Sequence, residues 1–202
     1  MRRCSSALVT AFIAIALPTA TLAAQTRPSE PWRGWLELDV GGAREDQGCS
    51  ACLRNDALGG LAFSGAVGLA LPNGFGTALV GRAFQEVSYE YSQRSRYLLA
   101  LAQYSLNAAP WATMNAGVGW GTHQGSSAPY ANDGSGAVLG IGLGIRVPAS
   151  SGLAATVTAD WLQSVSGARP AAGGRPESSF HPRLLTIGIG FSAATSRLDE
   201  SR

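Results

Sequence analysis

The sequence has little charge and no lysine. Charged residues make up 14% of the chain, and all 15 basic residues are arginine. Without Arg2 and Arg3, the chain carries 15 − 2 = 13 basic residues against 13 acidic ones, so its formal charge is zero. This balance does not indicate a nucleic-acid partner, which would favour a basic surface.

A sustained apolar period of 3.6 residues is also missing, which argues against amphipathic helices. Glycine, in contrast, is abundant, with 26 residues. Together these features predict an all-β chain with many tight turns.

The first 24 residues have the pattern of a secretory signal peptide. Two arginines precede an apolar run from Ala7 to about Leu17, which Pro18 and small residues up to Ala24 follow. We predict cleavage near Ala24. The alternative is a membrane anchor, which would need roughly 20 apolar residues, but Pro18 interrupts the run.

Two cysteines, Cys49 and Cys52, remain after the predicted cleavage. In an exported protein, such a pair is typical of a small disulfide in a loop. Idle thiols, a redox pair and a zinc site are the alternatives. A redox pair would require a neighbouring helix start in a βαβ pattern, and zinc would require two more ligands.

Residues 137–147 show the strongest local pattern. Leu139, Ile141, Leu143 and Ile145 fall on one parity, and glycines alternate with them. A period of two predicts a β-strand with one apolar face and one face of small residues. Similar alternation predicts eight strands in all, at residues 34–44, 59–71, 75–87, 94–106, 111–121, 137–147, 153–165 and 183–192.

The connections between these strands alternate strictly in length. Three are tight, at residues 72–74, 107–110 and 148–152, and four are polar and mostly longer, at 45–58, 88–93, 122–135 and 166–182. Short periplasmic turns, long outer loops and an even strand count are typical of a transmembrane β-barrel. A strand of about ten residues at ~3.3 Å each, tilted by roughly 40°, spans about 25 Å, the height of the apolar band of such barrels.

Six charged residues within the strands lie on the parity opposite the large aliphatic side chains. A soluble β-sandwich or lipocalin-like barrel, the alternative fold, would place polar residues outward. We therefore predict a lumen in which Arg82 and Arg146 pair with some of the acids, because lone buried charges are costly. Bulky side chains of residues 82–86 and 97–101 should fill the space left by glycines elsewhere. The candidate lumen ion-pair residues are Glu37, Asp39, Arg82, Glu86, Arg146 and Asp160.

Aromatic residues provide a separate indication. On the predicted topology, six of them face outward near the two ends of the barrel, as expected of interfacial girdles. Trp35 and Trp111 fall on the inward parity near the periplasmic mouth. The predicted girdle residues are Phe63, Phe75, Tyr104, Trp120, Trp161 and Phe191.

In this architecture the chain resembles the small eight-stranded outer-membrane barrels of Gram-negative bacteria, the OmpA-like and OmpX-like barrel domains. The resemblance implies a polar lead at residues 25–33, a barrel at 34–192 and a polar periplasmic tail at 193–202. It further implies a monomer in the outer membrane that contacts the bilayer and lipopolysaccharide after insertion by the barrel-assembly machinery. Many such barrels end on an aromatic residue, whereas here the tail follows Phe191.

The sequence predicts a structural or loop-mediated surface role, with a largely filled lumen and no cofactor. A narrow pore or lipid-accepting cavity, giving a small transport or lipid-handling barrel, is the alternative. Barrels that deacylate lipid A carry a His-x-Ser pair, but Gln124 and Gly125 follow His123. We therefore expect no enzyme. Both histidines, His123 and His181, fall in predicted outer loops and are expected at a solvated surface. Tyr89, Tyr91, Arg94 and Arg96 form an aromatic-basic patch, for which phosphate contacts of lipopolysaccharide or a partner protein are open.

Overall fold

The computed structural model describes residues 33–46, 57–71, 73–87, 92–106, 108–127, 130–150, 152–165, 169–170, 176–177 and 181–194. The predicted signal peptide, the Cys49–Cys52 pair, Tyr89 and Tyr91 lie outside the described residues. So does most of the predicted tail.

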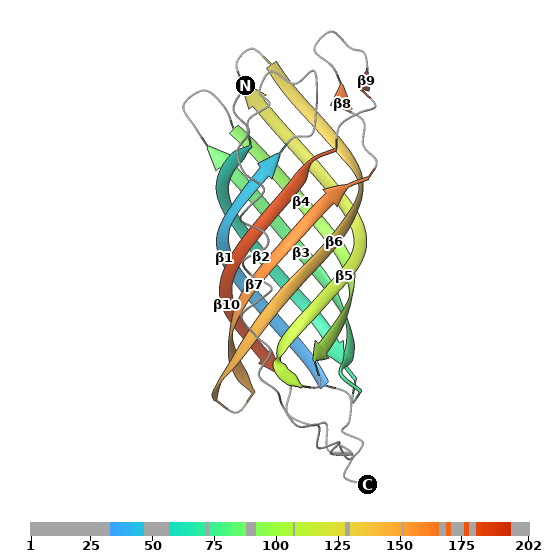
Figure 1. The fold of residues 1–202 in the computed structure, drawn as a ribbon. Helices are drawn as coiled ribbons and strands as arrows, with labels where there is room; N and C mark the ends of the chain where they lie inside the picture. The colour runs from blue at the N-terminus through green and yellow to red at the C-terminus, as the bar shows by residue number, and fades with distance from the viewer. Residues whose placement is uncertain are drawn as a thin grey trace, which may run out of the picture.

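Eight long strands close into one antiparallel up-and-down barrel, as the sequence predicts (Figure 1). Each strand pairs with its neighbours in the chain, and the first strand pairs with the last to complete the barrel. A two-stranded sheet of β8, Arg169–Pro170, and β9, Pro176–Glu177, lies in the connection before the last strand. The barrel strands are β1 Arg33–Asp46, β2 Leu58–Ala70, β3 Phe75–Val87, β4 Ser92–Leu106, β5 Ala109–Ser127, β6 Tyr130–Ser150, β7 Leu153–Ser164 and β10 Arg183–Ala194.

Two of the short turns depend on a glycine in the left-handed region. Gly74 has a φ of 86° and Gly152 a φ of 84°, where a side chain would be strained. Beside Gly74, the Asn73 Oδ1 atom accepts a hydrogen bond from the Phe75 amide at 3.2 Å. These turns hold the strand ends together at the end of the barrel where β1 begins and β10 ends (Figure 1).

The predicted loop at residues 122–135 is wrong over most of its length. β5 continues to Ser127 and β6 begins at Tyr130, with pairs from Thr122↔Ser135 to Ser127↔Tyr130. The reason is that strands pair through backbone hydrogen bonds. The two strands can therefore continue through residues that have no apolar face. These residues continue the wall toward the long loops, because β5 stays paired with β4 as far as Ser92↔Ser126.

Most of the large apolar side chains on the described strands face outward. On β6, Ile141 is 56% exposed and its neighbours of the same parity are exposed as well, whereas Gly140 and Gly144 are buried. Exposed apolar residues of this kind occur on all eight strands. A surface of this size needs an apolar environment, which a bilayer provides. A closed barrel can lie in a bilayer because its backbone groups pair between neighbouring strands. Within the described residues, no helix is long and apolar enough to cross a membrane.

Candidate functional site

An apolar plug fills the half of the lumen that lies nearest the long loops, which we call the outer half. Phe84 of β3 and Leu99 of β4 are 1% exposed, and Val138 of β6 is fully buried. Tyr97, Leu58, Leu162 and Leu184 complete the cluster. A Cβ atom on Gly140 would lie 3.0 Å from Leu99 and 2.9 Å from Leu162. The prediction that bulky side chains of β3 and β4 occupy the space left by glycines is therefore confirmed.

Two ion pairs cross the inner half of the lumen, which is the half nearest the short turns. Arg82 donates a hydrogen bond from Nη2 to Asp160 Oδ2 at 2.8 Å, and another from Nη1 to the Thr186 hydroxyl at 3.3 Å. Arg146 lies 3.1 Å from Glu37 Oε2, and its guanidinium carbon is 4.7 Å from the centre of the Trp35 ring. Both arginines therefore have an acidic partner on a different strand, which offsets the cost of removing the charges from water.

Asp39, a third lumen acid, is held by hydroxyl groups. Ser64 donates to its Oδ2 atom at 3.1 Å and Thr156 to its Oδ1 atom at 2.8 Å. Glu86 lies half-buried near the outer end of β3. The inner half leaves a cavity of about 40 Å³, room for roughly three water molecules. It borders Trp35, Gln103, Thr158 and the charged groups described above.

A second polar cluster lies beside the plug, and the sequence did not predict it. Glu45 of β1 is fully buried and accepts hydrogen bonds from three successive inward residues of β4. Ser95 donates at 2.8 Å, Tyr97 at 2.8 Å, and Gln93 donates through Nε2. Because β1 and β4 are not neighbours in the sheet, this carboxylate connects two walls of the lumen.

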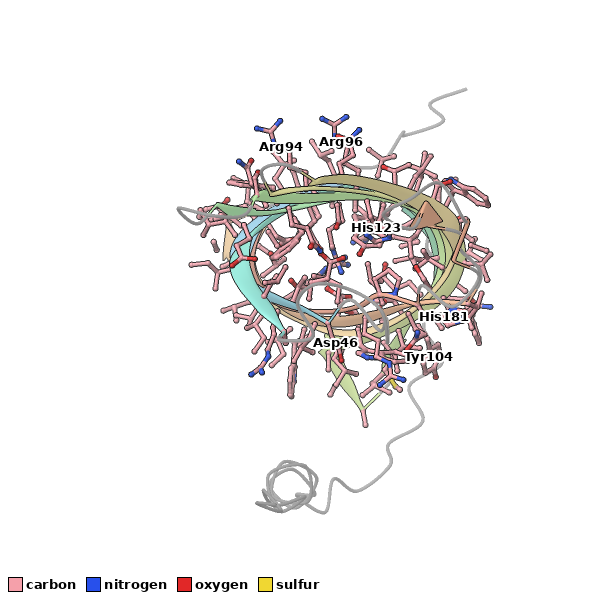
Figure 2. All side chains as sticks on the ribbon, turned by 90° about the horizontal axis from the view of Figure 1, so that it is seen from above. Asp46, Arg94, Arg96, Tyr104, His123 and His181 are labelled. Carbon is pink, nitrogen blue, oxygen red and sulfur yellow. The ribbon has the colours of Figure 1, made fainter. Side chains whose placement is uncertain are left out.

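His123 belongs to this cluster, so the prediction of a solvated surface histidine is wrong. Its side chain is buried in the lumen, with the residue 4% exposed, because β5 continues past the predicted strand end and His123 keeps the inward parity (Figure 2). Its Nδ1 atom is 3.0 Å from Ser95 Oγ and 3.2 Å from Glu45 Oε1. His181, in contrast, is half-buried, and its backbone carbonyl accepts a hydrogen bond from Gln163.

Serine, histidine and glutamate together suggest a catalytic relay, but the geometry differs from one. A relay needs the acid on one ring nitrogen and the hydroxyl on the other. Here Ser95 and Glu45 both face Nδ1 of His123. The cluster is thus built to satisfy one buried carboxylate. Among the described residues, no group of His, Cys, Asp and Glu side chains is arranged to hold a metal ion.

The six predicted girdle aromatics all lie on outward positions. Phe75 and Tyr104 are in contact, with ring centres 4.8 Å apart. The prediction for Trp111 is wrong, because its side chain is 48% exposed and does not pack in the lumen. The β4–β5 register shifts between Ser105 and Leu106, which interrupts the parity on which the prediction depended.

Arg94 and Arg96 project from the outer face of β4, away from the lumen that holds His123 (Figure 2). Their cross-strand neighbours are uncharged, namely Ala83, Gln85, Thr122 and Gln124.

Comparisons with known proteins identify the fold. No family model matches the chain, and no curated protein matches it by sequence. Among solved structures, Neisserial surface protein A has a TM-score of 0.56 at 11% identity, covering 79% of this chain and 96% of that one. The N-terminal β-barrel domain of OprF from Pseudomonas aeruginosa has a TM-score of 0.53 at 13% identity, covering 80% and 97%. Ail, the attachment invasion locus protein of Yersinia pestis, has a TM-score of 0.51 at 13% identity, covering 81% and 98%. The chain therefore has the fold of the small eight-stranded outer-membrane barrels.

Proposed function

We propose that this protein is a non-enzymatic outer-membrane barrel whose lumen is closed to solutes and which acts through its outer surface. The observation that carries the proposal is the apolar plug of Phe84, Leu99 and Val138, together with the ion pairs beneath it. Apolar side chains of this kind narrow the described part of the lumen and offer little to hydrated ions. A structural role, or an interaction role of the outer loops, remains for such a barrel.

The proposed location is the outer membrane of a Gram-negative bacterium, reached as a monomer through the barrel-assembly machinery. Its support is the outward apolar surface and the fold. In this orientation the short turns face the periplasm, and Arg94 and Arg96 lie toward the lipopolysaccharide of the outer leaflet.

Conductance across a planar bilayer tests the closed lumen. The wild-type protein should give no stable channel, whereas a Phe84→Ala, Leu99→Ala double variant should give intermittent conductance, because it removes two side chains from the plug. Heat-modifiable migration of the same samples on detergent gels shows whether both proteins are folded. A stable, discrete channel from the folded wild-type protein would contradict the proposal and indicate a transport role.

A further inference from the structure

The outward-facing surface of the barrel strands contains an apolar groove of about 770 Å³. This volume is within the size range of small-molecule sites. Its floor includes small side chains, Ala102, Ala116 and Ala159, from three strands. Larger residues rise around them and form the sides. These are Phe75, Met114, Ile141, Leu143, Trp161 and Leu185.

One cross-strand row connects this groove to a basic residue. From β1 the row runs Arg44↔Leu185↔Trp161↔Ile141↔Ala116, and all but Arg44 line the groove. Neighbouring strands are about 4.8 Å apart, so Arg44 lies roughly 10 Å from Trp161. Because Arg44 is near the end of β1, it lies at the end of the groove nearest the long loops.

A second arginine lies next to the first. Arg183 is exposed, stands two residues before Leu185 on the same face of β10, and donates through Nε to Gln163 Oε1 at 2.8 Å. Asp46 is its cross-strand neighbour on β1, so the group of two arginines and one aspartate carries a net charge of +1. Positive charge at the outer end of an apolar groove is complementary to a lipid with an anionic head.

We propose that Arg44, Arg183 and the groove beneath them bind one phosphorylated glycolipid of the outer leaflet. An acyl chain lies over Ala116 and beside Trp161, and a phosphate group accepts hydrogen bonds from the two arginines. This inference rests on the outer-membrane location proposed above. It assigns the phosphate contact to a different side of the barrel from Arg94 and Arg96, since Asp46 and Tyr104 lie opposite those two residues (Figure 2).

Native mass spectrometry of the refolded barrel in detergent, with added lipid A as the probe, tests the site. The wild-type protein should retain one lipid A molecule, and should retain dephosphorylated lipid A and phosphatidylcholine at least about tenfold more weakly, a difference of about 1.4 kcal/mol. Two variants should weaken retention to a similar extent. Arg44→Gln with Arg183→Gln removes the charge, and Ala116→Phe fills the groove with another apolar side chain.

Two matched controls should retain lipid A as the wild-type protein does. Arg94→Gln with Arg96→Gln removes the same charge from the opposite side, and Ala83→Phe adds the same ring at an exposed position outside the groove. Equal retention by all variants, or equal retention of phosphatidylcholine, overturns the inference. If the samples also lack heat-modifiable migration, the outer-membrane proposal fails as well, whereas folded barrels without selective retention contradict only the lipid site.

Discussion

At the scale of single residues, inward glycines decide how closely the walls of the lumen can pack. A Cβ atom on Gly142 would lie 1.9 Å from Asp160 Oδ1 and 2.7 Å from Asn115 Oδ1. The space at this position is therefore too small for a side chain, although the alternating pattern of the sequence alone would allow a serine there.

We predict that Gly142→Ser destabilises the barrel by about 1–3 kcal/mol, because overpacking displaces Asp160 from Arg82. Urea unfolding of the refolded protein in detergent, followed by tryptophan fluorescence, measures the change. Gly81→Ala is the matched control, since a Cβ atom there would meet nothing within 4 Å. Equal stability of the two variants would show that the lumen is looser than the structure indicates.

Glu45 is the most highly coordinated lumen acid among the described residues. Glu45→Ala would leave the hydroxyl groups of Ser95 and Tyr97 and the amide of Gln93 without their acceptor. We expect a loss of roughly 3–5 kcal/mol in the same unfolding measurement.

Ser164→Ala provides the comparison for Glu45→Ala. The Ser164 hydroxyl is buried and has no hydrogen-bond partner among the described residues. Its removal should change stability by less than about 1 kcal/mol. A Glu45→Ala variant as stable as Ser164→Ala would contradict the role assigned to the outer polar cluster.

At the scale of the strand, β6 passes from an apolar surround into water along one face. Ile141 and Ser135 share the outward parity, and both are exposed. Ile141→Arg should cost about 2–4 kcal/mol and hinder insertion into vesicles, because it puts a charge on the lipid-facing wall. Ser135→Arg should insert normally, since residue 135 lies toward the long loops, before the outward apolar side chains of β6 that begin at Leu139. The fraction of heat-modifiable protein after refolding into vesicles measures both, and normal insertion of Ile141→Arg would count against a lipid-facing β6.

The strands were predictable where one face meets lipid, because there the two parities differ sharply in side-chain type. Residues 122–127 and 130–135 are mostly polar or small on both parities, so the signal faded although the backbone pairing continues. Extending the inward parity past Gly121 would have placed His123 in the lumen, and the same step past Arg44 would have placed Glu45 there.

At the scale of the whole molecule, the charged set of the lumen was predictable but its pairing was not. Parity indicates that Arg82 and Arg146 face inward. Their choice of Asp160 and Glu37 depends on the stagger of strands around the closed barrel, which the sequence of one strand does not contain. The lipid groove depends on the same stagger, since its row joins residues of β1, β10, β7, β6 and β5.

The central claim is that the outward face of the barrel meets lipid along its middle. In a protein with Cys49→Ser and Cys52→Ser, nitroxide labels at Leu139→Cys, Ile141→Cys, Leu143→Cys and Ser135→Cys test it by electron paramagnetic resonance in vesicles. The three apolar sites should be accessible to oxygen and shielded from a water-soluble nickel chelate, while the label at residue 135 should show the reverse. If the label at residue 141 meets the nickel chelate as readily as the label at residue 135, the barrel does not span the membrane in this way.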